Sequence, residues 1–172
     1  MNHPLRAYVD ASYKDGRIGI GIAIFEGPSL VTLIAQSDYG SNSFYGEATA
    51  LKKAMSIICL EQGHSNIQIL TDCKGCVDTC TLPENEFVFR VGKMVDQKTA
   101  LALESIRGFI VSSSKVNLTW VRGHNRNLGN DYADFAANKA RFVQGKKILY
   151  DRQLGLPPPP IQKRKALAFG CP

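Results

Sequence analysis

The sequence predicts a mixed α/β fold whose central sheet has five strands, three antiparallel strands followed by two parallel ones, flanked by helices. Over the first 36 residues, branched apolar residues alternate with polar residues or glycine, which is typical of strands. From Gly46 onward, apolar residues recur at helical spacing. Later in the chain, short β-branched runs alternate with helical stretches, so we expect those strands to be parallel crossovers on the same sheet.

Three strands open the chain. The first starts at Leu5 and includes Asp10, and Asp15-Gly16 supplies a hairpin turn. In residues 17–25, isoleucine occupies every second position while glycine and alanine fill the other face. This pattern predicts one face toward a core and one face that another backbone approaches closely. A turn at Gly27 then leads into a third strand over residues 30–36.

Helices and strands alternate in the rest of the domain. The helix from Gly46 is expected to end at Gly63, and a buried strand from Asn66 to Thr71 follows. The remaining predicted elements are a short helix over residues 73–80, a longer helical stretch from Pro83 to Phe109, a strand over 115–121, a loop over 122–129 and a helix over 130–142. The sequence therefore predicts one domain over residues 1–145 and a tail over residues 146–172.

The tail has a different composition. Pro157 to Pro160 favour an extended polyproline II segment, and Gln162-Lys163-Arg164-Lys165 forms a basic cluster. The simpler interpretation is a solvated tail or one laid along the domain. A contact with nucleic acid or with a protein partner is the alternative.

The bulk composition limits the class of protein. The chain has 172 residues, 21 Lys and Arg against 15 Asp and Glu, and a net charge of +6, which favours a polyanionic partner. No apolar run is long enough to cross a membrane, and the first residues lack a signal core, so we expect an intracellular protein with no membrane partner. Cys73, Cys76 and Cys80 share one helix face. We expect them to be core thiols rather than ligands of a metal or an iron–sulfur cluster.

Four acidic residues stand at strand ends or on helices. They are Asp10, Glu47, Asp72 and Asp134. If the first and fourth strands are neighbours, Asp10 and Asp72 meet, and two helices can bring the other two acids to the same point. Carboxylates that share a small volume repel each other unless cations lie between them, and their hard oxygen ligands favour Mg²⁺ or Mn²⁺. Two such ions can hold one phosphodiester, activating water and stabilising the leaving oxygen.

Five motifs around these acids resemble the ribonuclease H family, type 1, over residues 5 to 143. In order, they are Tyr8-Val9-Asp10-Ala11-Ser12, Tyr45-Gly46-Glu47-Ala48-Thr49-Ala50-Leu51, Ile69-Leu70-Thr71-Asp72-Cys73, Trp120-Val121-Arg122-Gly123-His124 and Asn130-Asp131-Tyr132-Ala133-Asp134. Each motif is weak alone, but five of them in the family's order and spacing are specific. The order of strands and helices also agrees with that family's fold.

The resemblance implies a function and a role for each residue. It implies an endoribonuclease, expected to be a monomer, that cuts the RNA strand of RNA–DNA hybrids with two Mg²⁺ ions, or with Mn²⁺, leaving 5′-phosphate and 3′-hydroxyl ends. Asp10 would bridge both ions, Asp134 would complete one metal site, and Glu47 and Asp72 would complete the other. His124 would assist proton transfer or product release.

The resemblance also implies substrate contacts, including contacts from Glu47 to the 2′-hydroxyls that distinguish RNA from DNA. The other residues expected to contact substrate are Ala11, Ser12, Asn42, Ser43, Phe44 and Tyr45. The stretch before Glu47 departs from the family's usual Asn or Gln plus Arg, so Phe44 and Tyr45 either stack on the substrate or pack. The basic, Trp-rich protrusion of many bacterial members is replaced by a region of mixed charge.

Two other functions remain open at this point. One is a nuclease of the same fold that cuts DNA or another structured nucleic acid. The other is a binding module without catalytic activity. His124 and the order of the acids argue against the first, and the presence of all four acids argues against the second.

Overall fold

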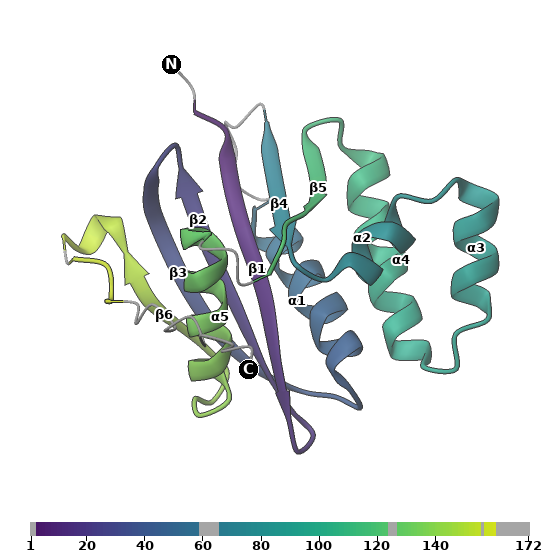
Figure 1. Cartoon of the computed structure of the whole chain (residues 1–172), viewed down its shortest axis with the longest axis horizontal. Coiled ribbons are helices and arrows are strands. Elements are labelled where there is room, and N and C mark those ends of the chain that lie inside the picture. Colours follow the sequence, from purple (N-terminus) through teal and green to yellow (C-terminus); the bar gives the residue numbers. More distant parts are fainter. Residues whose placement is uncertain (1–2, 59–65, 124–126, 156, 161–172) are drawn as a thin grey trace, which may run out of the picture.

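A computed structural model describes residues 3–58, 66–123, 127–155 and 157–160 as a sheet covered by helices (Figure 1). The strands are β1 (Leu5–Lys14), β2 (Arg17–Glu26), β3 (Ser29–Tyr39), β4 (Ile67–Thr71), β5 (Val116–Trp120) and β6 (Lys146–Asp151). The helices are α1 (Ser43–Ile58), α2 (Lys74–Cys80), α3 (Glu84–Gly92), α4 (Gln97–Ser112), α5 (Leu128–Ala140) and the short 3₁₀ helix η1 (Arg152–Leu154).

The sheet has six strands in the order β5-β4-β1-β2-β3-β6. Strands β1, β2 and β3 pair antiparallel, β4 runs parallel to β1, and β5 runs parallel to β4. The predicted mixed α/β sheet flanked by helices is therefore confirmed. The predicted number of five strands is wrong, because β6 adds an antiparallel strand beside β3.

The sixth strand comes from residues that the sequence assigned to the tail. Its first three side chains, Lys146 to Ile148, are exposed, so this strand lacks the alternation of buried and exposed residues by which strands are recognised. Main-chain pairing with β3 holds it instead. At its start, Gly145 has a φ of 68° and exchanges hydrogen bonds of 2.9 Å with Ser37. The predicted division of the chain into a domain and a tail stays a prediction for the residues that follow β6.

The two faces of β2 carry different helices. Ile18, Ile20 and Ile22 are fully buried in the core that includes α1. On the other face, α5 lies across the sheet (Figure 1). A methyl group added at Gly21 would overlap the carbonyl oxygen of Ala133 on that helix, and one at Gly19 would overlap the next turn of α5. The close backbone approach predicted from the glycine and alanine face is confirmed.

Polar caps set the helix boundaries that apolar spacing missed. Helix α5 begins at Leu128, two residues before the predicted start, because the side chain of Asn127 accepts hydrogen bonds from Gly129 and Asn130. The long helical stretch is divided into α3 and α4, and the side chain of Asp96 caps the second. Gly63, the predicted end of α1, lies outside the described residues.

The three clustered cysteines are free thiols. Cys76 and Cys80 are fully buried in the core, in agreement with the expectation that they are core residues, and Cys73 is half-buried beside it. Cys59 and Cys171 lie outside the described residues. Among the helices of the described ranges, none has the length and hydropathy needed to span a membrane.

Replacing Gly21 with alanine should destabilise the fold. The added methyl group would push α5 away from β2, which we expect to lower the free energy of unfolding by about 2–4 kcal/mol. Urea denaturation measures this change. Gly108→Ala in α4 is the matched control, because its methyl group would meet nothing within 4 Å and alanine favours a helix by about 1 kcal/mol. Equal stability of the two variants would contradict the close packing.

Candidate carboxylate metal site

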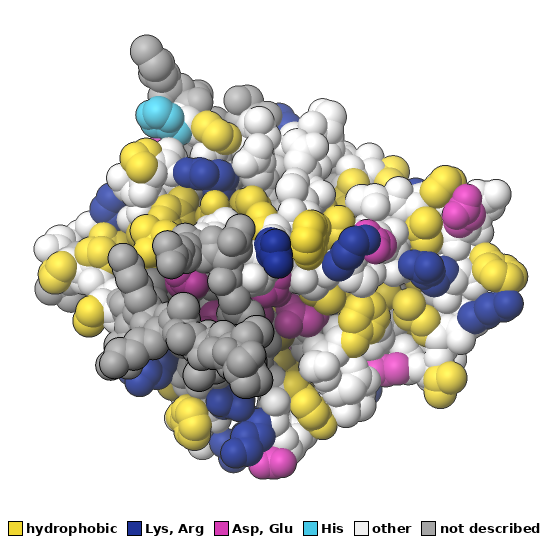
Figure 2. All heavy atoms as spheres, in the orientation of Figure 1, with side chains coloured by type: hydrophobic (Ala, Val, Ile, Leu, Met, Phe, Trp, Pro, Cys, Tyr) yellow, Lys and Arg dark blue, Asp and Glu magenta, His cyan; other side chains and the backbone are white. Residues whose placement is uncertain are grey.

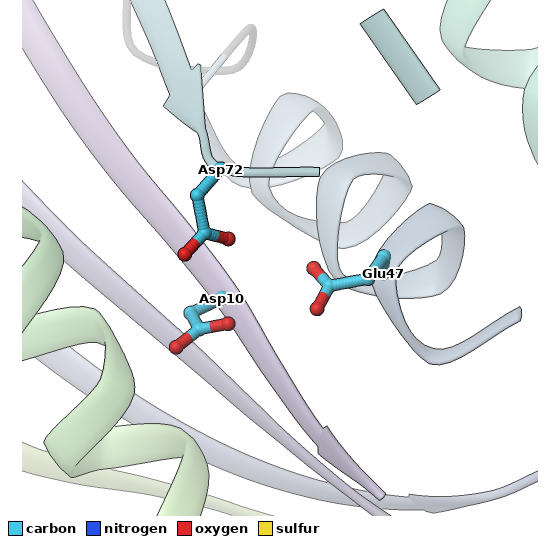
Figure 3. A group of neighbouring side chains, drawn as sticks. All are labelled: Asp10, Glu47 and Asp72. Carbon is cyan, nitrogen blue, oxygen red and sulfur yellow. The ribbon is translucent and has the colours of Figure 1, made fainter. Parts of the chain in front are cut away.

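Strand pairing brings two of the predicted acids together. In the parallel ladder between β1 and β4, Val9 lies opposite Thr71, so the next residues, Asp10 and Asp72, lie side by side. Glu47 reaches the same point from the first turns of α1. One carboxylate oxygen from each of these three residues lies within 4.8 Å of the others. Figure 3 shows the three carboxylates facing a common space between β1, the end of β4 and α1.

The group is buried enough for its charges to matter. Asp10 is 8% exposed, and its Oδ1 accepts a 2.8 Å hydrogen bond from the backbone N–H of Ala11. Burial raises the pKa of Glu47 to about 10, and the negative charge of Asp10 adds to the shift. Oε2 of Glu47 is buried and has no hydrogen-bond partner among the described residues. Three crowded carboxylates with an unpartnered buried oxygen fit a hard divalent cation. The cation would give Oε2 of Glu47 a partner and offset the repulsion between the negative charges.

Several neighbours hold Asp72 in place. The indole nitrogen of Trp120 donates a 3.1 Å hydrogen bond to the backbone oxygen of Asp72. The buried amide of Asn130, on α5, donates a longer bond of 3.5 Å to its Oδ2. Gly123 closes the remaining side, because a methyl group there would lie 2.5 Å from the same oxygen. These contacts fix the direction in which Asp72 presents its carboxylate.

Asp134 is not a member of this group of three acids. It lies half-buried on α5 and is outside the group whose oxygens lie within 4.8 Å of one another. Its Oδ1 accepts a 2.8 Å hydrogen bond from the side-chain amide of Asn138, one turn further along the helix. The structure thus brings together three of the four predicted metal ligands, and the participation of Asp134 stays a prediction.

The predicted substrate residues lie in two places. Ser12 follows the site along β1, and its hydroxyl donates to Oδ1 of Asn138 at 3.2 Å. Asn42 caps α1 by accepting a 2.8 Å hydrogen bond from the N–H of Tyr45, and Ser43 is exposed. Phe44 and Tyr45 are half-buried and pack against the core. These positions agree with the packing interpretation of the two rings and leave their contact with substrate as a prediction.

His124 lies outside the described residues, so its predicted role is untested. Sequence reasoning gave no role to Asn130, Asn138, Trp120 or Gly123 individually. Three of these residues occur within the quoted motifs, which was an available signal, whereas Asn138 lies beyond the last motif. Figure 2 shows acidic side chains near the middle of one face of the molecule, with Lys and Arg side chains around them.

Removing the charge of Glu47 should stabilise the metal-free protein. A carboxyl group with a raised pKa keeps its proton in the folded state and loses it in the unfolded state, so stability falls as pH rises from about 4.5 toward 10. We expect Glu47→Gln to raise the free energy of unfolding at pH 8 by about 1–3 kcal/mol in EDTA. Mg²⁺ should raise the melting temperature of the original protein but hardly that of the variant.

Thermal unfolding with EDTA and with Mg²⁺ measures both effects. Glu104→Gln, at an exposed position of α4, is the matched control and should change neither quantity. A Glu47→Gln protein less stable than the original in EDTA would show that the carboxylate is not under electrostatic strain.

Replacing Gly123 with alanine should weaken metal binding. Its backbone φ is not in the left-handed region, so the only obstacle is the contact of the new methyl group with Oδ2 of Asp72. Displacing that oxygen should weaken Mn²⁺ binding about tenfold, as measured by titration calorimetry. Gly92→Ala, which meets open space, controls for the substitution itself. Unchanged binding by the Gly123 variant would mean that Asp72 does not ligate the ion.

Comparison with known proteins identifies the fold of this chain and the family to which it belongs. The profile of the RNase H family matches residues 2–142. RNase H1 from the archaeon Halobacterium salinarum NRC-1 superposes with a TM-score of 0.62 and 17% identity, covering 80% of this chain and 96% of that one. LC9-RNase H1, described as a type 1 RNase H with the type 2 active-site motif, superposes with a TM-score of 0.69 and 18% identity. The match covers 87% of this chain and 78% of that one.

A third solved structure is LC11-RNase H1 in complex with an RNA/DNA hybrid. It gives a TM-score of 0.58 and 12% identity over 79% of this chain and 98% of that one. None of the curated protein sequences matches the chain. The solved structures are too distant in sequence to show more than a common fold, but the family profile covers most of the chain. The resemblance predicted from the sequence is confirmed, and the chain belongs to the ribonuclease H family of nucleases.

Proposed function

We propose that this protein is an endoribonuclease that hydrolyses the RNA strand of RNA–DNA hybrids by two-metal-ion catalysis, giving 5′-phosphate and 3′-hydroxyl ends. The observation that carries the proposal is the group formed by Asp10 within β1, Asp72 just after the paired strand β4, and Glu47 on α1. Family membership supports the reaction. The hybrid bound by LC11-RNase H1, a protein of the same fold, supports the choice of substrate.

Each acid has a role that its position favours. Asp10 lies between Glu47 and α5, which suits a ligand shared by two ions, while Glu47 and Asp72 would complete one metal site and Asp134 the other. When bound, Mg²⁺ or Mn²⁺ supplies the positive charge that lowers the pKa of the attacking water and stabilises the leaving oxygen. Partial burial of the group lowers the local dielectric and strengthens these electrostatic interactions.

The remaining proposed residues concern the substrate and its protons. Ser12 and the backbone at Ala11 lie beside the acids on β1, where 2′-hydroxyl groups flanking the scissile phosphate would pass. His124 would move a proton near the leaving group or help product release. The net charge of +6 favours association with the polyanionic hybrid.

The substrate is tested by offering one labelled sequence as an RNA–DNA hybrid, double-stranded RNA, single-stranded RNA and double-stranded DNA. Each is incubated with Mg²⁺, Mn²⁺ or EDTA and analysed on a denaturing gel. We expect cleavage of the RNA strand of the hybrid alone, dependent on either ion and absent in EDTA. Cleavage of DNA would instead support a nuclease of the same fold with another substrate, and binding without cleavage would support a binding module.

Replacing Asp10 with asparagine should abolish cleavage while leaving hybrid binding intact. The variant keeps the size of the side chain but removes the charge placed between the other acids, so we expect a loss of at least 10³-fold in kcat. Gel cleavage and fluorescence anisotropy measure the rate and the hybrid affinity. Asp78→Asn, at an exposed position of α2, is the matched control. Cleavage at the original rate by the Asp10 variant would reject the catalytic assignment.

A further inference from the structure

Three polar residues follow one face of α5 at intervals of four. They are Asn130, Asp134 and Asn138, one turn apart, so their side chains lie above one another on the helix. Asparagine is a poor helix former, and two of them on one face of a 13-residue helix lower its intrinsic stability. Asn130 contacts Asp72 and Asn138 contacts Asp134. This face of α5 therefore touches two of the four acids through amide groups.

Asn138 links the C-terminal part of α5 to strand β1. Its Nδ2 donates to Oδ1 of Asp134 at 2.8 Å and to the backbone oxygen of the same residue at 2.9 Å. Its Oδ1 accepts from the hydroxyl of Ser12 on β1 at 3.2 Å and from Nη2 of Arg141 at 3.2 Å. Arg141 caps the same helix, so the bond with Ser12 is the one that an asparagine bonding only to its own helix would not make.

The chemistry of the partners fixes the orientation of this amide. A guanidinium group can only donate hydrogen bonds and an ionised carboxylate can only accept them. Oδ1 of Asn138 must therefore face Arg141, and Nδ2 must face Asp134. Ser12 meets Oδ1, so its hydroxyl proton is used for that bond, and only its lone pairs remain available to a substrate.

Arg141 is itself held at the end of α5. Its backbone oxygen accepts a hydrogen bond from Nη1 of Arg17, on β2, at 3.3 Å. Its side chain also packs beside Gly19. Rotation of the Asn138 amide would therefore break its bond with Ser12 on β1 and its bond with Arg141, whose backbone is held by Arg17 of β2.

We propose that Asn138 is a positioning residue that sets the orientation of the Asp134 carboxylate for metal binding and ties it to Ser12, which it holds as a hydrogen-bond acceptor toward the substrate. This inference rests on the proposed function, because it gives Asn138 a role through Asp134 and Ser12. Groups that hydrogen-bond metal-ligating carboxylates orient them, and removing such a group typically lowers activity or metal affinity 10–100-fold.

The test is a double-mutant cycle between Asn138 and Asp134. Asn138→Ala and Asp134→Asn are made singly and together, with Asn138→Leu as a second variant of similar volume that also lacks the donor. Lys139→Ala, the exposed neighbour on α5, is the matched control. The measurements are kcat, KM for the hybrid and the Mg²⁺ concentration for half-maximal rate. Mn²⁺ binding by calorimetry gives a readout that does not depend on turnover, and melting temperatures show whether each variant is folded.

We expect both Asn138 variants to lower kcat 10–100-fold, to raise the Mg²⁺ requirement and to weaken the Mn²⁺ binding that Asp134→Asn also weakens. KM should change less than about threefold, because Ser12 is one of many contacts to the hybrid. On the Asp134→Asn background, loss of Asn138 should cause little further change, since its effect acts through that carboxylate.

Two results would overturn the positioning role. One is wild-type kcat and Mn²⁺ binding in both Asn138 variants. The other is a loss of equal size with and without the Asp134 carboxylate, which would show a structural role alone. Failure of the proposed function looks different, because the unmodified protein would then not cut the hybrid, or Asp10→Asn would still cut it.

Discussion

The close contact between the glycine face of β2 and α5 is the constraint on which the site depends. Because Gly19 and Gly21 have no side chains, the helix backbone rests directly on the sheet. At that distance the short side chains of Asn130 and Asn138 reach groups on or next to strands β4 and β1. A larger residue at Gly19 or Gly21 would lift the helix, and asparagine and aspartate are too short to follow. Alternate residues of β2 thus serve the two faces of the sheet: the isoleucines pack in the core, and the glycines let α5 approach the polar site.

The acidic group works against the stability of the metal-free fold. Burial and the charge of Asp10 raise the pKa of Glu47 to about 10, so the folded protein holds a carboxyl group in a place where its ionised form is disfavoured. The surrounding core, with isoleucines on β2 and a buried methionine on α1, supplies the stability that this arrangement costs. Such local destabilisation is characteristic of functional sites, where residues are selected for the ligand they bind rather than for their own packing.

Much of the fold and of the site could be predicted because it is encoded by short-range patterns. The alternation of isoleucine and glycine predicted both faces of β2, and the condition that the first and fourth strands are neighbours predicted the meeting of Asp10 and Asp72. Strand β6 could not be predicted, because it is an edge strand held by main-chain hydrogen bonds. Its side chains do not alternate between buried and exposed positions. The role of Asn138 depends on Ser12, 126 positions earlier in the chain, and no local pattern records that pairing.

Strand β6 also determines how the sheet ends. The family match stops at residue 142, yet the sheet continues through residue 151, so a boundary drawn from the family alone would remove a strand. Without it, residues 32–36 of β3 would expose an open row of N–H and C=O groups, which is a template for pairing with another chain. With it, the outermost strand carries Lys146 and Lys147, and charged residues at a sheet edge discourage such pairing. We therefore expect a version that ends before residue 146 to associate through the exposed edge of its sheet, even though every acidic residue of the site is retained.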